Sequence, residues 1–165
     1  MGVLTDYFRA PDAASVVRVL EQAEGGSPLF TEPPAFDGVE AKHVDPAVVL
    51  AQLIAAIRQI EWRVDLVQET TVWPTSPPPP GPHSPEDEDD PWATGPWVSE
   101  LPPEVRDTLA GVHDSEIPAI VTRWVQAEEL RGTRAEDIQP LAEELILLAR
   151  QAHSADDRLY CWMSL

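Results

Sequence analysis

Hydrophobic residues recur along the chain with two different spacings, which separate predicted strands from predicted helices. Residues 3–10 are short, aromatic and β-prone, and residues 63–73 alternate in part, so both segments are predicted strands. A third, shorter candidate strand covers 39–42. The C-terminal run 158–165 is also β-type, and because such a run is unstable alone, it should pair with a strand of the N-terminal half.

Two segments of the first half have helical spacing. Asp12 is a suitable N-cap for a helix that ends at Gly25-Gly26 and carries on one face Val16, Val17 and Leu20. Residues 25–38 then form a predicted loop. Asp45 and Pro46 begin a second helix, whose apolar stripe comprises Leu50, Leu53, Ile54, Ile57 and Ile60.

The second half is mainly helical in its pattern. A short helix covers 104–110, and a longer one begins near Ser115 and ends at Gly132, with an apolar side made of Ile117, Ile120, Val121, Trp124 and Leu130. Thr133 and Glu136 have capping-box spacing for a last helix, in which Pro140 is a candidate break and the apolar face holds Leu141, Leu145, Leu148 and Ala152. The fold class is therefore α+β, a single domain over 1–165 with a small sheet of about three strands packed by four or five helices.

A proline-rich and acidic stretch, residues 74–97, is predicted to be a long loop inserted between the two halves. Eleven of the 18 prolines lie between Pro74 and Pro103, and four consecutive prolines favour a stiff polyproline II spacer. Five adjacent carboxylates follow, which repel one another and should stay extended and solvated. Two Pro-Trp pairs end the stretch.

Two interpretations of this stretch stay open. In the first, both tryptophan rings fold back onto the domain and hold the loop in place. In the second, the stretch is a recognition segment in which tryptophans anchor a partner and carboxylates steer a basic surface. The partner-binding candidates are Glu86, Asp87, Glu88, Asp89, Asp90, Trp92 and Trp97.

Charge narrows the classes of partner. At 165 residues with 43% hydrophobic content the chain can bury a core, and its 29 acidic against 11 basic residues give a net charge of −18. Nucleic acid and anionic membranes need clustered cations, so both are disfavoured, whereas a basic protein partner is favoured. Because no apolar stretch is long enough to span a membrane and no secretory signal opens the chain, a cytoplasmic location is expected.

Residues that could carry chemistry are few and scattered. No pair of the four histidines, His43, His83, His113 and His153, has the spacing of helical metal ligands, so neither a metal nor a cofactor is expected. Cys161 lies in an apolar run, where a thiol is expected to be buried and inert. Nucleophile-elbow, Walker and Rossmann motifs are absent from the sequence, which argues against an enzyme.

The two ends of the chain carry a resemblance. The opening Met1-Gly-Val-Leu-Thr-Asp-Tyr-Phe8 and the closing helix with Arg158-Leu-Tyr-Cys-Trp162 resemble small uncharacterised bacterial proteins, among them an actinobacterial group and, more remotely, the YfbM-like family. The resemblance covers about the first 20 and the last 35 residues. It implies an α+β domain, and it implies no agreed activity or catalytic residue. An Arg-rich, Lys-poor composition is compatible with a bacterial source.

These observations favour a non-enzymatic, cytoplasmic interaction module that binds a basic protein. Immunity-type and antitoxin-type inhibitors are one such subclass, since charge steering speeds the capture of a basic target. The alternative is a small-ligand-binding domain or an enzyme, with a site assembled at the sheet edge from Tyr7, His43, Trp124 and Tyr160. A third reading is that the charge serves solubility only.

Overall fold

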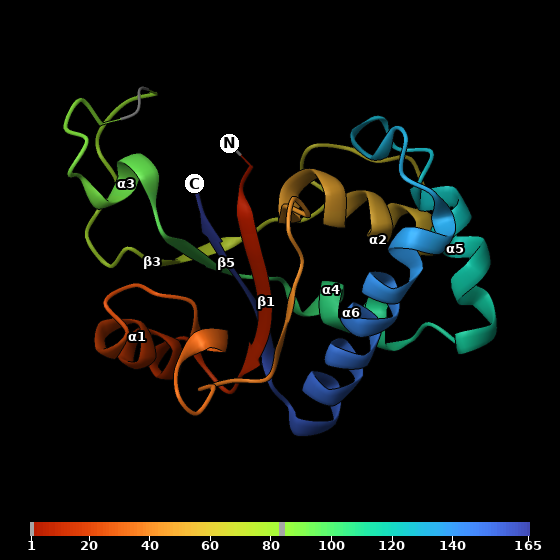
Figure 1. Cartoon of the computed structure of the whole chain (residues 1–165), viewed down its shortest axis with the longest axis horizontal. Coiled ribbons are helices and arrows are strands. Elements are labelled where there is room, and N and C mark those ends of the chain that lie inside the picture. The colour runs from red at the N-terminus through yellow and green to blue at the C-terminus, as the bar shows by residue number, and fades with distance from the viewer. Residues whose placement is uncertain (1, 83–84) are drawn as a thin grey trace.

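One antiparallel sheet of five strands forms the centre of the protein (Figure 1). The computed structural model describes residues 2–82 and 85–165, so His83 lies outside the described residues. The strands follow the spatial order β2-β1-β5-β4-β3. They are β1 (Leu4–Ala10), β2 (Gly38–Glu40), β3 (Thr70–Trp73), β4 (Trp97–Glu100) and β5 (Arg158–Ser164).

The central strands of the sheet come from opposite ends of the chain. β1 and β5 pair along seven residues, from Leu4 opposite Ser164 to Ala10 opposite Arg158. This pairing confirms the prediction that the C-terminal run joins a strand of the N-terminal half. Both halves of the chain therefore contribute to one sheet.

One face of the sheet carries most of the helices. Figure 1 shows α2, α4, α5 and α6 grouped on the same side of β1. Their bounds are α2 (Ala51–Arg58), α4 (Pro103–Ala110), α5 (Ile117–Trp124) and α6 (Ala135–Ala155). Tyr7 and Cys161 point from the sheet into this larger core. These helices pack on this face because the apolar stripe of each one is buried against the sheet or against a neighbouring helix.

The opposite face of the sheet packs against α1 (Ala13–Gln22). Phe8 and Tyr160 point to this side, since neighbouring residues of a strand face opposite ways, and their rings stack with centroids 5.5 Å apart. Val16 and Leu20 of α1 are fully buried against them. The carboxylate of Asp12 accepts a hydrogen bond from the Ser15 amide at 2.7 Å, which confirms the predicted N-cap.

The α+β class is as predicted, but within the part of the chain that the structure describes the sheet has five strands instead of about three, and there are six α-helices instead of four or five. The predicted loop 74–97 contains a short helix, α3 (Pro91–Thr94), and the first residue of β4. The predicted strand 63–73 is reduced to β3. Its first part is a turn, in which the Leu66 amide donates to the Arg63 carbonyl oxygen at 3.1 Å.

Helix boundaries differ from the predicted ones at two places in the second half. The predicted helix from near Ser115 to Gly132 is broken, and α5 covers only its first half, because the Gln126 amide bonds three residues back in a tight turn. The capping-box prediction is wrong: Thr133 belongs to the preceding turn and α6 begins one residue after Arg134. Pro140 lies inside α6 and does not break this helix, which is 21 residues long in total.

In the first half, the second helix begins where it is predicted to begin, but its first turn is not α-helical. Asp45 caps it, since its carboxylate accepts a hydrogen bond from the Val48 amide at 2.8 Å. The first turn, Pro46–Leu50, is a π-helix, and α2 follows directly, with Gln59 as its left-handed C-cap residue at a φ of 55°. Among the described residues no helix is long and apolar enough to cross a membrane.

Candidate functional site

The predicted recognition segment has local structure of its own. The Asp87 carboxylate accepts the Asp89 amide at 2.9 Å, and the Asp90 carboxylate accepts the Trp92 amide at 2.8 Å and so caps α3. The run from Glu86 to Asp89 is exposed, as predicted for solvated acids. Hydrogen-bonded turns replace the expected extended chain, since each aspartate can accept a bond from an amide two residues further on.

The two tryptophans of this segment lie against the protein. The indole N–H of Trp92 donates to the carbonyl oxygen of Ser76 at 3.2 Å, and Trp97 is part of β4 opposite Met163. Both side chains are half-buried. This placement agrees with the interpretation that the rings hold the loop in place, and partner binding by residues 86–97 stays a prediction.

The four residues of the alternative site are not brought together. Tyr7 and Trp124 are both buried in the larger core and act as donors to main-chain oxygens around the π-helical turn. The Tyr7 hydroxyl donates to Val44 at 2.6 Å and the Trp124 indole to Val49 at 2.9 Å. Tyr160 is on the other face of the sheet.

His43, the remaining member, is exposed in a turn with a φ of 67°. Cys161 is buried, as predicted, and burial raises the pKa of its thiol well above the usual value, so the reactive thiolate is disfavoured. Among the described side chains, no group of three or more His, Cys, Asp or Glu residues is arranged to hold a metal ion.

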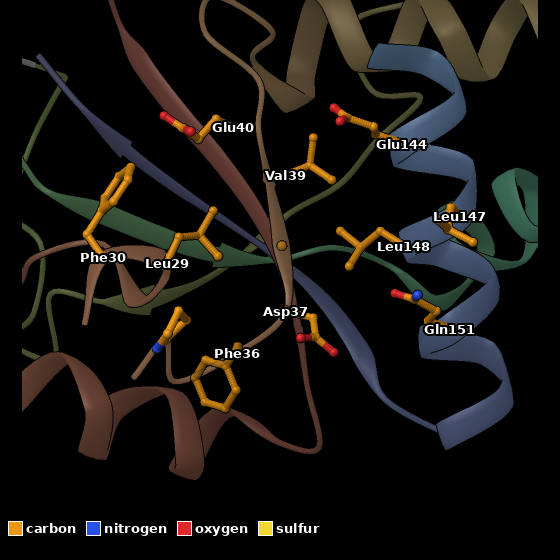
Figure 2. A pocket seen from close by; sticks show the side chains of 12 residues that line it. Leu29, Phe30, Phe36, Asp37, Val39, Glu40, Glu144, Leu147, Leu148 and Gln151 are labelled. Atoms are coloured by element: carbon orange, nitrogen blue, oxygen red, sulfur yellow. The ribbon is translucent and has the colours of Figure 1, made fainter. Parts of the chain in front are cut away.

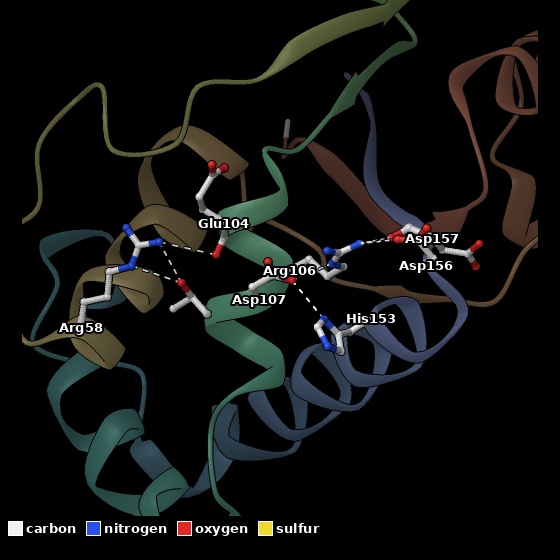
Figure 3. Close-up of polar contacts among 8 residues, drawn as sticks. Arg58, Glu104, Arg106, Asp107, His153, Asp156 and Asp157 are labelled. Atoms are coloured by element: carbon white, nitrogen blue, oxygen red, sulfur yellow. Dashed lines mark hydrogen bonds and ion pairs between the residues drawn. The ribbon is translucent and has the colours of Figure 1, made fainter.

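A polar network joins α4 to the turn between α6 and β5 (Figure 3). Arg106 donates to the main-chain oxygen of Asp157 at 2.9 Å and pairs with Asp107 at 2.8 Å. His153 lies 3.2 Å from the same Asp107 carboxylate on a largely exposed surface. The Arg106–Asp157 and Asp107–His153 contacts join α4 to the end of α6 and the turn after it, and we assign the network a structural role.

A shallow cavity of about 480 Å³ lies beside the end of α2 and is lined mainly by apolar atoms of Ala55, Trp62 and Trp124. Trp62 is fixed there because its indole N–H donates to the Ala47 carbonyl oxygen at 3.3 Å. Arg123, the cationic residue of the cavity lining, donates a hydrogen bond to the Ala56 carbonyl oxygen at 3.0 Å. Its guanidinium therefore provides a donor for a carbonyl group in the last turn of α2, and we assign it this structural role rather than anion binding.

A groove of about 730 Å³ follows the outer edge of β2 and is the candidate functional site (Figure 2). β2 runs through the middle of the groove. The segment containing Leu29, Phe30 and Phe36 lies on one side of it and α6, with Leu147 and Leu148, on the other. The groove is therefore bounded by one wall from each side of the sheet.

Apolar side chains are unusually exposed on both walls. Phe30 is 66% exposed and Leu147 is 53% exposed, whereas Val39 on β2 and Leu148 on α6 are buried beneath them. Large apolar residues that gather in one concave place, rather than lying singly on the surface, are typical of an interaction site.

Every charged residue that lines the groove is acidic: Asp37, Glu40 and Glu144. Asp37 is paired with Arg9 at 2.6 Å, and the same guanidinium reaches Asp157 at 2.7 Å, so Asp37 is tied to the fold. Glu40 and Glu144 are exposed and form no ion pair with any other described residue. Two unneutralised carboxylates therefore face the groove.

The local sequence explains why the groove wall lies so close to the sheet. A Cβ atom at Gly38 would collide with the Tyr7 carbonyl oxygen and with the side chain of Leu29. Only glycine permits this approach. Ser27 begins the wall: its hydroxyl donates to the buried Asp6 carboxylate at 2.6 Å and anchors the turn that carries Phe30.

Sequence reasoning missed this site. It placed residues 25–38 in a loop and assigned Leu148 to a buried helix face, which is correct for Leu148. Two signals were available. Leu147 lies outside the apolar stripe of its helix, and Phe30 is a large aromatic residue in a loop.

Comparison of this chain with protein-family models, with curated proteins and with solved structures finds no match. The resemblance of the two chain ends to the YfbM-like family therefore stays a prediction.

Proposed function

We propose that this protein is an interaction module that binds an extended, basic segment of a partner protein in the groove beside β2. The observation that carries the proposal is the joint presence of exposed apolar side chains and unpaired carboxylates in one groove. Phe30 and Leu147 supply apolar contact, and Glu40 and Glu144 supply negative charge. A segment that combines apolar side chains with Lys or Arg would satisfy both.

The net charge of −18 supports the same partner class. A strongly acidic protein attracts basic proteins over long distances and repels nucleic acid, which raises the rate of productive encounters. An inhibitor that captures a basic protein, such as an immunity or antitoxin protein, works in this way. The predicted segment 86–97 is a second acidic surface, and it lies near the opposite edge of the sheet, between β3 and β4.

The test uses a defined probe, the peptide acetyl-Lys-Lys-Leu-Val-Lys-Lys-Leu-amide, which carries Lys and apolar residues at both odd and even positions, and the same peptide with Glu in place of Lys as a negative control. Binding is measured by titration calorimetry at low and moderate salt. We expect the basic peptide to bind and the acidic one not to bind, with the affinity falling as salt rises, since the contacts are exposed.

Two double variants with the same charge change locate the binding surface. Glu40→Gln/Glu144→Gln removes two carboxylates from the groove, and Glu86→Gln/Glu88→Gln removes two from the acidic segment. At about 0.5 kcal/mol for each exposed pair, the groove variant should weaken binding about five-fold. The segment variant should leave the affinity nearly unchanged. The opposite result would move the binding surface to residues 86–97.

The apolar contribution is tested by Phe30→Ala and Leu147→Ala, each measured beside Val64→Ala. Val64 is 77% exposed and lies outside the groove, so its variant controls for the general loss of an exposed apolar side chain. The groove variants should weaken peptide binding and leave the free energy of unfolding within about 0.5 kcal/mol of the parent. Binding that is insensitive to all groove variants would refute the proposed function.

A further inference from the structure

We propose that the bound segment joins the sheet as a sixth strand, hydrogen-bonded to the outward main-chain groups of Gly38 and Glu40. This inference rests on the proposed function and specifies how the groove recognises its partner. It concerns the main chain of β2, whereas the proposed function concerns the side chains around it.

The hydrogen-bond pattern between β1 and β2 leaves the outer edge of β2 available. The Ala41 amide donates to Thr5 at 2.8 Å and the Arg9 amide donates to Asp37 at 3.1 Å, on either side of the aligned pair Tyr7 and Val39. In an antiparallel ladder these inward positions alternate with outward ones. The N–H and C=O groups of Gly38 and Glu40 therefore point away from β1.

The two edges of the sheet differ in their suitability for another strand. β3, at the other edge, has a bulge between Thr71 and Trp73, and Pro74 follows it directly. Bulges and prolines are the devices that protect an edge from further pairing. β2 pairs with β1 in an unbroken register and contains no proline. Of these two edges, β2 is the one that can accept a strand.

The shape of the groove favours a strand over a helix. Its walls lie on the two sides of the sheet, with Leu29 and Phe30 on one side and Leu147 and Leu148 on the other (Figure 2). Successive side chains of a strand point to opposite faces, so alternate residues of the guest would meet alternate walls. A helix satisfies its own main chain and would leave the Gly38 and Glu40 groups without partners.

The charges select a basic guest over a second copy of this chain. One unpaired carboxylate lies on each side of the groove: Glu40, at the end of β2, on the side of Phe30, and Glu144, on α6, on the side of Leu147. Pairing of β2 with the β2 of another copy would bring these carboxylates together between two molecules that each carry −18. Lys or Arg side chains at both odd and even positions of a guest strand would instead meet an acid on each side of the groove.

Two N-methylated forms of the peptide defined above test strand addition. One form carries methyl groups on the amides of residues 2, 4 and 6, and the other on those of residues 3 and 5. Only one set of amides can face β2, so one form should lose at least ten-fold in affinity and the other should stay within about two-fold. Equal loss in both forms, or loss in neither, overturns strand addition.

Hydrogen exchange of the intact protein provides a second readout. On peptide addition the amides of Gly38 and Glu40 should exchange at least ten-fold more slowly, and the Val39 amide, already paired with β1, should change little. If the peptide binds in a manner that depends on Glu40 and Glu144 but does not protect these amides, the proposed function holds and strand addition is overturned. If the protection instead rises with protein concentration in the absence of peptide, the edge belongs to a second copy of the chain, and strand addition by the peptide is overturned as well.

Discussion

Replacing Gly38 with alanine should separate β2 from β1, because the added Cβ would overlap the Tyr7 carbonyl oxygen. A main-chain oxygen in a paired strand cannot rotate away, so the strain must move the backbone. Overpacking of this kind costs about 1–3 kcal/mol, and weakening the flanking bonds of Ala41 and Arg9 adds to it. We expect a loss of about 2–3 kcal/mol and, for a chain of this length, a fall in Tm of about 4–12 °C.

Urea denaturation followed by circular dichroism measures the loss, and hydrogen exchange of residues 37–41 locates it. Gly132→Ala is the matched control, since no atom lies near its Cβ position and only its φ of 88° opposes the change. That control should lose about 1–2 kcal/mol without faster exchange in β2. A loss below about 0.5 kcal/mol for Gly38→Ala, with unchanged exchange, would refute the close approach of the two strands.

Two further predictions concern buried polar groups. Tyr7→Phe removes the hydroxyl that donates to the Val44 carbonyl oxygen at 2.6 Å and should lower the free energy of unfolding in urea by about 1–3 kcal/mol. Tyr160→Phe should cost less, because the Tyr160 hydroxyl bonds the partly exposed Glu100, and equal costs would contradict this reasoning. Burial raises the pKa of Asp6 despite its bond from Ser27, so its contribution to stability is full below pH 3.8 and is lost as the pH rises through the folded-state pKa. Asp6→Asn, which can still accept that bond, should therefore gain stability over the parent at pH 7 and lose this advantage near pH 3, and a pH-independent difference would contradict the assignment.

The central part of the sheet could be predicted because its information is local. Residues 3–10 and the C-terminal run have β-type composition, and neither is stable unless it pairs, so their pairing follows from elementary energetics. The N-caps at Asp12 and Asp45 are equally local, since each depends on one side chain and an amide three residues away. These predictions are confirmed.

β4 and the groove depend on contacts between distant residues, so periodicity cannot reveal them. Trp97 follows a proline in a segment whose composition is typical of loops, and it becomes part of a strand because β5 pairs with it. Phe30 and Leu147 are separated by more than one hundred residues and line the same groove only because β2 lies at the sheet edge beside α6. The candidate strand 39–42 overlaps β2 only at Val39 and Glu40, since a three-residue strand carries too few positions to show an alternating pattern that would fix its bounds.

Under the proposed function, the placement of the two acidic surfaces predicts that they act at different stages of binding. β2 and β3 are separated by four inter-strand spacings of about 4.8 Å, or about 19 Å, and the segment 86–90 belongs to the connection between β3 and β4, which lies on the side of the molecule away from α6 in Figure 1. Because salt screens charges beyond about 8 Å at physiological ionic strength, these acids cannot stabilise a segment bound at β2. In the proposed binding they would contribute only to the field that draws a basic protein toward the surface. Glu40 and Glu144 line the groove itself, so the proposal predicts that they act on the bound state and that specificity depends on the groove rather than on the net charge.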